Sequence, residues 1–490
     1  MRLLLPLFAL FASAVPALAE PREVPDFTGI PLAWLVIVAF AAAYGFVIWG
    51  ERHELKKSVP VLIGAGVIWT VVALVYIGYH DQSLLEEMNY GFEHSVVEIG
   101  ELTFFLITAM TYVITLEERN VFEWVRFRML AAGLSQRMIF WATGTFAFFL
   151  SPFLDNLTTA LALVSVVIAV GAATRDRGFV VLSAINLVVA ANAGGAFSPF
   201  GDITTLMVWQ AGKVDFFAFY ALFLPALVNW GVPAVIMSFA IKSSDAEVIN
   251  EPVVMKKGAV PMIGLFALTL FLAVTAHVAL DLPPVIGMTT GLGLLMLYGY
   301  FLQHHEHANW EPPALPESVP LDVVQTIENS FVPRHRPFDT MHGIRNLEWD
   351  TLLFFFGILT SVAGLAQLGF LLEASRFLYG EVGATVTNSI IGMLSAIVDN
   401  IPVMSAVLIM DPAMNEAQWM LVTLTTGVGG SLLSIGSAAG VALMGAARMQ
   451  DASGRWTNVY TFMGHLKWTW AVALGYVASI YVHILMHTMT

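Results

Sequence analysis

Long apolar segments are the feature that most constrains the fold of this chain. Residues 61–79 read VLIGAGVIWTVVALVYIGY, without a charged side chain, and about 20 apolar residues suffice for a helix to cross a bilayer. Over the whole chain 58% of the residues are hydrophobic and 12% are charged, whereas a soluble domain carries roughly 25% charged residues. The sequence therefore predicts an all-α polytopic membrane protein, with lipid as the solvent for most of its surface.

Charge and cysteine content exclude several classes of function. The net charge of −14 leaves no basic patch to meet phosphates, so nucleic acid is not an expected partner. The chain contains no cysteine, which excludes disulfides, thiolate nucleophiles and Cys-based metal sites. Residues 1–19, an apolar stretch with Arg2 near its start and Ala-Leu-Ala before Glu20, have the pattern of a signal peptide. The alternative is an uncleaved first helix.

Lysine and arginine concentrate in short loops, and cytoplasmic loops carry this positive charge. The loops that contain Arg119 and Arg175 are therefore predicted to be cytoplasmic. Residues 80–94 contain neither lysine nor arginine and are predicted to form an external loop before a span at 95–117. The resulting topology has about 10 full spans, or about 11 if the N-terminal segment is retained.

The predicted topology divides into two halves of opposite orientation. Each half has several spans, a hairpin, a long crossing and a last span, which is the inverted repeat common among secondary transporters. The first repeat is predicted at 20–249, with a hairpin at 138–174 and a broken helix at 178–212. The second repeat is predicted at 250–490, with a cytoplasmic loop at 304–348, a hairpin at 383–410 and a broken helix at 418–447.

The second hairpin is too short to cross the membrane. Residues 383–410 must supply both of its arms, and at about 1.5 Å per residue neither arm spans roughly 30 Å of hydrocarbon. This hairpin is therefore predicted to be re-entrant, with Asp399 and Asn400 at its buried tip. The arms of the first hairpin are long enough to leave the choice open. Repeat symmetry favours a re-entrant hairpin there too, with Asp155 and Asn156 at the tip.

Small residues interrupt the long crossing that follows each hairpin. The first crossing contains NAGGAFSPFGDITT at 192–205, and the second contains GVGGSLLSIGS at 427–437. Such residues at mid-membrane predict broken helices, and unwound backbone is tolerated there only where it is buried in protein or lines a polar cavity. Aligning the two segments places Asp202 opposite Ser437.

Four polar tips are thus predicted to converge near the midplane, and three of them carry carboxylates: Asp155, Asp202 and Asp399. Oxygen ligands around a carboxylate suit a small hard cation, and broken helix ends coordinate cations in transporters. We therefore predict that these aspartates are the metal ligands for Na⁺ and hold Na⁺ or H⁺ competitively, which is the minimal chemistry of antiport. Neutral oxygens are expected from Asn156, Asn400, Thr204, Thr205, Ser434 and Ser437.

These residues also have structural interpretations. Asp and Asn are common helix N-caps, although capping alone does not explain a costly buried acid in both halves. Serine and threonine in membrane helices often bond back to their own carbonyls. In the third span, Glu101 is a candidate proton relay, whereas Glu98 is interpreted as an interface residue. His94 is either a pH switch or an ordinary polar contact.

Several segments resemble the NhaD family of bacterial sodium/proton antiporters, which belongs to the ion transporter superfamily. They include EIGELTFFLITAMTYVITLEERNVFEW, SPFLDNLTTAL, NAGGAFSPFGDITTLMVW, NLEWDTLLFFFGIL, SAIVDNIPVMSAV and GHLKWTWAVALGYVASI, in the family's order. The resemblance implies a two-hairpin inverted-repeat fold in the bacterial inner membrane. It also implies a homodimer with an elevator-like motion, and exchange of Na⁺ and Li⁺ for H⁺ without a cofactor.

The same resemblance assigns site residues. The positions that match the family's functional positions are Asp155, Asn156, Asn192, Asp202, Thr204, Thr205, Ser395, Asp399, Asn400, Ser434 and Ser437. Glu101 and His94 match positions associated with activity or pH response.

Two alternatives remain open. A sodium-coupled dicarboxylate symporter of the same superfamily has Ser-Asn-Thr-like hairpin tips, whereas the acids at both tips here would repel an anion. An intramembrane aspartyl protease needs two facing carboxylates, and FGD at 200–202 partly matches its GxGD motif, but position 199 is Pro instead of the first Gly. A secondary transporter rather than an enzyme is expected.

Overall fold

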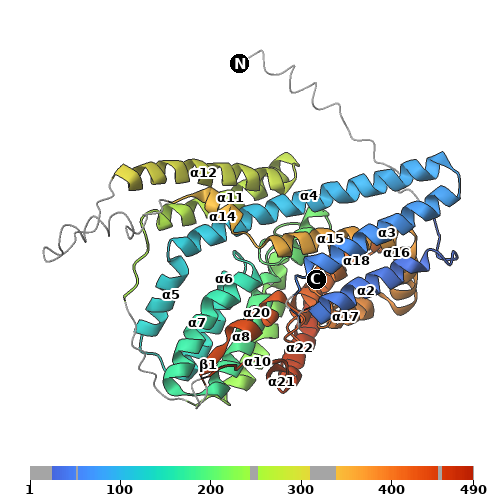
Figure 1. Ribbon diagram of the computed structural model, residues 1–490. Coiled ribbons are helices and arrows are strands. Elements are labelled where there is room, and N and C mark those ends of the chain that lie inside the picture. Colours follow the sequence, from blue (N-terminus) through green and yellow to red (C-terminus); the bar gives the residue numbers. More distant parts are fainter. Residues whose placement is uncertain are drawn as a thin grey trace.

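The computed structural model describes residues 25–50, 53, 55–242, 252–308, 338–450 and 455–488. These residues form a helical molecule (Figure 1). In the first half lie α2 (Trp34–Gly50), α3 (Ser58–Gly78), α4 (Gln82–Glu118), α5 (Val121–Ala131), α6 (Gln136–Leu150), α7 (Asn156–Thr174), α8 (Arg177–Gly195), α9 (Ile203–Gln210), the 3₁₀-helix η1 (Ala218–Leu222) and α10 (Phe223–Ser238).

The second half is also helical, apart from one short hairpin of strands. It contains α11 (Ala259–Leu280), α12 (Pro284–Ala308), α14 (Thr340–Arg345), α15 (Trp349–Gln367), α16 (Phe370–Ser375), the π-helix η2 (Arg376–Val382), α17 (Ala384–Leu394), α18 (Asn400–Met410), α19 (Glu416–Gly429), α20 (Ala438–Ala446), β1 (Arg448–Gln450), β2 (Trp456–Asn458), α21 (Phe462–Leu466) and α22 (Thr469–Thr488). The two strands pair antiparallel. Within the described ranges, nine helical segments are long and apolar enough to cross a membrane, which confirms the predicted polytopic all-α class.

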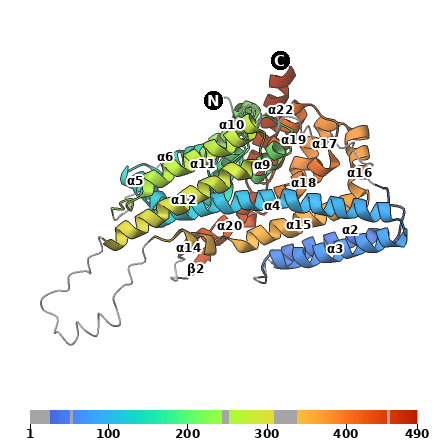
Figure 2. The ribbon, with the colours of Figure 1, turned by 90° about the horizontal axis from the view of Figure 1, so that it is seen from above.

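The helices fall into two packed groups. The first, here called the scaffold group, consists of α2, α3, α4, α11, α12 and α15. In it α3 packs on α2 and α15, and α4 packs on α12 and α15. The second, the core group, consists of α6–α10 and α17–α22, where α8 packs on α6 and α7, and α10 packs on α22. The groups meet where α18 packs on α15, and Figure 2 shows α4 running along the scaffold group.

The prediction of an external loop at 80–94 is wrong. Helix α4 begins at Gln82 and runs for 37 residues, about 55 Å at 1.5 Å per residue. Asp81 caps its start, because its carboxylate accepts hydrogen bonds from the N–H and the hydroxyl of Ser83 at 2.9 and 2.7 Å. The segment contains several Leu and Glu residues, which are strong helix formers, so its polarity does not interrupt the helix.

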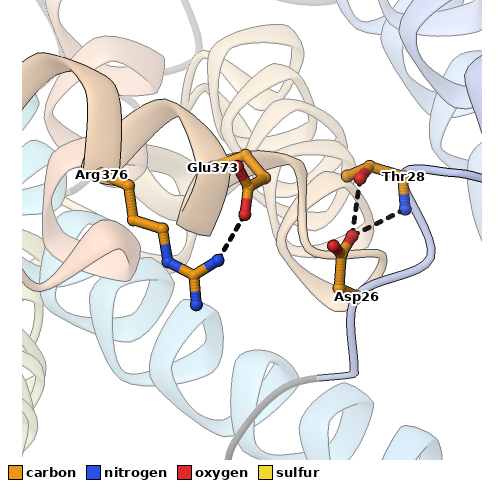
Figure 3. A network of polar contacts seen from close by, with 4 residues as sticks. All are labelled: Asp26, Thr28, Glu373 and Arg376. Atoms are coloured by element: carbon orange, nitrogen blue, oxygen red, sulfur yellow. Dashed lines mark hydrogen bonds and ion pairs between the residues drawn. The ribbon is translucent and has the colours of Figure 1, made fainter.

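The chain that precedes α2 is attached to the second half of the protein. The backbone N–H of Phe27 donates to the carbonyl oxygen of Leu368, at the end of α15, at 3.2 Å. Beside it, Asp26 accepts hydrogen bonds from the N–H and hydroxyl of Thr28, and these donors hold the pKa of Asp26 below its usual value. Arg376 and Glu373 form an ion pair close by (Figure 3). Both halves of the chain thus contribute to this end of the scaffold group.

Two helix pairs occupy the segments predicted as hairpins, and a helix break lies in each predicted crossing. The first hairpin is α6 and α7, and the second is α17 and α18, with 11 residues in each arm. An 11-residue helix is roughly 16 Å long, well short of a hydrocarbon thickness of roughly 30 Å. The first crossing is broken between α8 and α9, and the second between α19 and α20.

The two hairpins pack against their crossings in the same way. Ser151 donates to the carbonyl oxygen of Ala191 at 2.7 Å, and Ser395 donates to that of Thr426 at 2.9 Å. The backbones also approach so closely that only glycine fits. A Cβ on Gly194 would lie 2.2 Å from a carbonyl oxygen of α6, and one on Gly429 would lie 1.9 Å from a carbonyl oxygen of α17. This repeated packing brings the hairpin tips beside the helix breaks.

Some predictions fall outside the described residues. These are the segment 1–19, the boundary between the repeats at 249 and 250, and most of the loop 304–348, where positions 309–337 are not described. At the edges of that loop, α12 continues to Ala308 and α14 occupies Thr340–Arg345. The division into two repeats stays a prediction.

Candidate functional site

Asp155 lies at the tip of the first hairpin, where it caps α7. Its Oδ1 accepts from the backbone N–H of Thr158 at 2.8 Å, and its Oδ2 accepts from the hydroxyl of the same residue at 2.7 Å. The first N–H groups of a helix have no partner within the helix, and an N-cap aspartate accepts from one of them. Both carboxylate oxygens are therefore oriented by one residue three positions along the chain.

Asp202 lies at the break of the first crossing and caps α9. Only 5% of its surface is exposed. Its Oδ1 accepts from the N–H and the hydroxyl of Thr204 at 2.9 and 3.1 Å. A carboxylate buried to this degree in a membrane protein is expensive unless it has hydrogen-bond donors or a cation beside it.

Two hydrogen-bonded chains connect the hairpin tips to the helix breaks. Asn400, at the second tip, donates through Nδ2 to both carboxylate oxygens of Asp202, at 3.2 and 3.1 Å. Asn156, at the first tip, donates to Oδ1 of Asn192 at 2.7 Å. Asn192 in turn donates to the hydroxyl of Ser437 at 3.2 Å. Both chains run between the two halves of the sequence, so the four predicted tips do converge.

Asp399 is held in a different way from Asp155. It precedes α18, but its side chain makes no capping hydrogen bond to that helix. Its backbone N–H donates to the hydroxyl of Tyr44 on α2 at 2.8 Å. The second tip is thus attached to a helix of the scaffold group.

A cavity of about 440 Å³ joins these groups. Asp155, Asp202 and Asp399 all line it, together with Asn156 and Asn400. Apolar residues of α4, such as Phe105 and Val113, are also part of the lining. At its far end the cavity reaches the exposed residues Glu117, Glu123 and Glu348, here called the acidic mouth. Glu117 and Glu123 flank Arg119, so the mouth lies on the side that the positive-charge asymmetry predicts to be cytoplasmic.

The lining is strongly biased in charge. It contains six acidic residues and, among the residues that the structure describes, no lysine, arginine or histidine. The carboxylates are spread along the cavity: in the described ranges no three His, Asp or Glu side chains are grouped closely enough to hold one metal ion. A cation in this cavity would therefore meet the carboxylates in combination with amide, hydroxyl and carbonyl oxygens, rather than a cage of three carboxylates.

Three of the hydroxyls predicted at the ion-binding site contact other protein atoms in the structure. Thr205 donates to the carbonyl oxygens of Ser198 and Asp202, at 2.8 and 2.6 Å. The hydroxyl of Ser395 is bonded to the backbone of α19, and that of Ser434 lies 3.3 Å from the sulfur of Met444. These hydroxyls stabilise the breaks and the hairpin packing in this structure.

The structure does not bring Glu101 and His94 to the cavity. Both lie on α4 and neither lines it. His94 is exposed and its Nε2 lies 3.2 Å from Glu98. Any role of these two residues in proton relay or pH response acts at a distance from the three aspartates.

Sequence reasoning identified Thr204 and Asn400, which orient Asp202, but missed the residues that contact the other two aspartates. Thr158 stands three positions after Asp155, and the N-cap spacing was a usable signal for it. Tyr44 lies 355 positions from Asp399, and no local pattern connects them. The acidic mouth was also not predictable from a local pattern, because Glu117 and Glu348 come from opposite halves of the chain.

Comparisons with known proteins identify relatives over most of the chain. A sequence model of the citrate transporter family matches residues 8–427. The chain is 45% identical to the Na(+)/H(+) antiporter NhaD of Alkalimonas amylolytica, covering 96% of this chain and 94% of that protein. It is also 45% identical to the NhaD antiporter of Vibrio cholerae, covering 98% and 97% respectively. Sodium/proton antiporter 1 of Arabidopsis thaliana is 29% identical and covers 92% of this chain and 72% of that protein.

Proposed function

The chain belongs to the citrate transporter family and, within it, to the NhaD sodium/proton antiporters, and we propose that it exchanges Na⁺ for H⁺ across the bacterial inner membrane, with Asp155, Asp202 and Asp399 as the carboxylates that hold the two cations in turn. It is a multi-pass membrane protein. The exchange of Li⁺, the homodimer and an elevator-like motion of the core group against the scaffold group belong to the same proposal.

The observation that carries the proposal is the acidic cavity. Its inner end is formed by the three aspartates, its mouth by glutamates, and its described lining includes no basic side chain. A cavity lined by one sign of charge concentrates ions of the opposite sign. Such a lining attracts Na⁺ and H⁺ and repels anions.

The mechanism follows from competition at shared oxygens. Na⁺ enters past the acidic mouth and displaces protons from the aspartates, because a carboxylate oxygen cannot hold a proton and coordinate a cation with the same lone pair. Asn400 and Thr204 keep Asp202 oriented during the exchange. After the site is exposed to the other face, protons return to the carboxylates and Na⁺ leaves. The H⁺:Na⁺ ratio equals the number of protons displaced per cation bound.

The two alternatives fit the site less well. An anion symporter, which the name of the matching family model suggests, needs donors or positive charge for a carboxylate substrate, whereas the inner end of the cavity carries three carboxylates. An aspartyl protease needs two carboxylates facing each other, whereas Asp202 faces the amide of Asn400.

Inverted membrane vesicles provide the test. Respiration generates a ΔpH, which quenches the fluorescence of a dye. Addition of Na⁺ or Li⁺ at pH values from about 7 to 9.5 is expected to restore the fluorescence. Fewer of the aspartates are protonated as the pH rises, so more of them are free to bind the cation. Choline should have no effect. Asp155→Asn is expected to abolish the response.

Asp281→Asn is the matched control. Asp281 lies exposed beyond α11 in a left-handed conformation, which Asn adopts readily. It should retain the wild-type response. A wild-type protein that gives no dequenching with Na⁺ at any pH would refute antiport and favour the anion symporter.

A further inference from the structure

The two hairpin tips orient their aspartates by different means. In the first tip, the third residue of α7 is Thr158, which gives Asp155 both an N–H and a hydroxyl donor. In the second tip, the third residue of α18 is Pro402, which is buried and has neither donor. Proline has no backbone N–H, so α18 cannot orient Asp399 as α7 orients Asp155.

A residue from outside the hairpin acts on Asp399. The Asp399 N–H donates to the hydroxyl of Tyr44 at 2.8 Å. Tyr44 is half-buried on α2, and its ring lies 6.2 Å from that of Phe40 in a stacked arrangement. Both rings pack against the main hydrophobic core. The phenol is therefore fixed by packing and offers its oxygen at one place.

This contact fixes the backbone from which the Asp399 side chain projects. Asp399 has φ −48° and ψ 143°, and the helix begins at the next residue. Holding its N–H fixes the peptide plane in front of Asp399 and so restricts φ. Because Asp399 lines the same cavity as Asp155 and Asp202, a small rotation of this residue changes the distance from its carboxylate to a bound cation.

We propose that Tyr44 is a positioning residue for Na⁺ binding, in which a scaffold helix supplies to Asp399 the orientation that Thr158 supplies to Asp155 within the first hairpin. This inference rests on the proposed antiport function. It also makes the two tips unequal: the first is oriented from within its own hairpin, whereas the second is oriented through a helix of the other group and loses this support whenever the groups separate.

The test compares Tyr44→Phe with the wild-type protein in the vesicle assay. The ring and its packing stay, and only the hydroxyl is lost. The half-saturating Na⁺ concentration is expected to rise about three- to tenfold, the factor that corresponds to one neutral hydrogen bond. The maximal exchange rate per folded protein should stay at the wild-type level. The same shift is expected in the Na⁺ concentration that stabilises the purified protein against heat.

Tyr76→Phe is the matched control. Tyr76 on α3 also uses its hydroxyl to join the two halves of the chain, donating to the carbonyl oxygen of Gln367 at 2.8 Å. Gln367 does not line the cavity, whereas Asp399, which contacts Tyr44, does. Loss of the Tyr76 hydroxyl is expected to lower thermal stability without moving the half-saturating Na⁺ concentration.

Rescue gives a readout that a merely structural role would not produce. Adding Pro402→Thr to Tyr44→Phe restores the Asp-Asn-x-Thr pattern of the first hairpin and is expected to return the half-saturating Na⁺ concentration to within about twofold of wild type, since the capping donors are regained. If the double variant folds and keeps the raised value, the proposal is wrong. If the double variant does not fold, Tyr44→Phe alone decides.

The two proposals fail in different ways. A wild-type protein without Na⁺-driven proton flux refutes the antiport function itself. A wild-type protein with normal flux, together with a Tyr44→Phe variant whose half-saturating Na⁺ concentration is unchanged or whose only defect is a lower maximal rate, refutes the role of Tyr44 and leaves the antiport function in place.

Discussion

The side-chain amide of Asn400 donates to both carboxylate oxygens of Asp202, across 198 positions of sequence. Asn400 begins α18 at the tip of the second hairpin, and Asp202 caps α9 at the break of the first crossing. The geometry of the cavity's inner end therefore depends on a contact between the two halves of the chain.

Loss of this amide is expected to impair ion binding directly. Hydrogen bonds to charged groups contribute roughly 1.5–3 kcal/mol, so Asn400→Ala should raise the half-saturating Na⁺ concentration by about tenfold or more. The measurement is the Na⁺ titration of dequenching in vesicles. Asn415→Ala is the control, because Asn415 caps α19 from an exposed position and should affect stability alone. Equal titration curves for Asn400→Ala and wild type would contradict this role.

Close backbone packing at the hairpins gives a second prediction. Gly429→Ala places a Cβ 1.9 Å from the carbonyl oxygen of Gly392, and a backbone carbonyl cannot yield as a flexible side chain can. Overpacking costs about 1–3 kcal/mol, so the detergent-solubilised variant should melt several degrees lower or fail to accumulate. Gly445→Ala, in α20 with open space around it, should be neutral or slightly stabilising. A normal melting temperature for Gly429→Ala would show that the hairpin and crossing are less closely packed.

The location of the site was predictable because its acidic residues differ from the apolar sequence around them. Asp155, Asp202 and Asp399 stand in apolar or glycine-rich segments, where an acid is costly without a function. The short arms of the second hairpin were predictable from length alone. What each tip contacts was not predictable, because Tyr44 and Asp399 or Asn192 and Ser437 meet only after the whole chain has folded.

The error at residues 80–94 has a local cause. The prediction used the absence of Lys and Arg to place a loop, although charge bias orients segments and does not end helices. Asp81 followed by Ser83, Leu84 and Leu85 is a helix start by capping and propensity. Local propensity, applied first, would have extended the helix to Gln82.

The cap at Asp81 gives a third prediction, with a defined pH dependence. The hydroxyl and N–H of Ser83 hold the pKa of Asp81 below its usual value. At pH values above about 3.9, the ordinary pKa of an aspartate carboxyl, the cap contributes its full stabilisation to the start of α4. This stabilisation is lost as the pH falls through the lower pKa that Asp81 has in the folded protein. Asp81→Ala should speed amide hydrogen exchange of residues 82–86 at neutral pH, while residues 105–116 keep their protection. Unchanged exchange at 82–86 would show that the cap does not hold this end.

The acidic mouth gives the last prediction, since it sets how Na⁺ reaches the aspartates. Glu117 and Glu348 are exposed and line the outer end of the cavity, whereas Glu123 is paired with Arg126 at 3.0 Å. Exposed charges act over a Debye length of about 30 Å at 0.01 M salt and about 10 Å at 0.1 M. The double variant Glu117→Gln/Glu348→Gln should therefore raise the half-saturating Na⁺ concentration about two- to threefold at low ionic strength. Added choline chloride should remove the difference from wild type.

This salt dependence separates attraction of Na⁺ by the mouth from direct coordination, because coordinating oxygens are not screened in this way. Glu86→Gln/Glu87→Gln is the control: it removes the same charge near the opposite end of α4, away from the cavity, and should leave the titration unchanged at every salt concentration. If the mouth variant shows an equal defect at low and high ionic strength, Glu117 or Glu348 contacts the cation itself. If the control variant shifts as much as the mouth variant, net charge rather than the position of the glutamates controls entry. Attraction at the mouth predicts neither result, so its signature is a defect specific to Glu117 and Glu348 that disappears as the ionic strength rises.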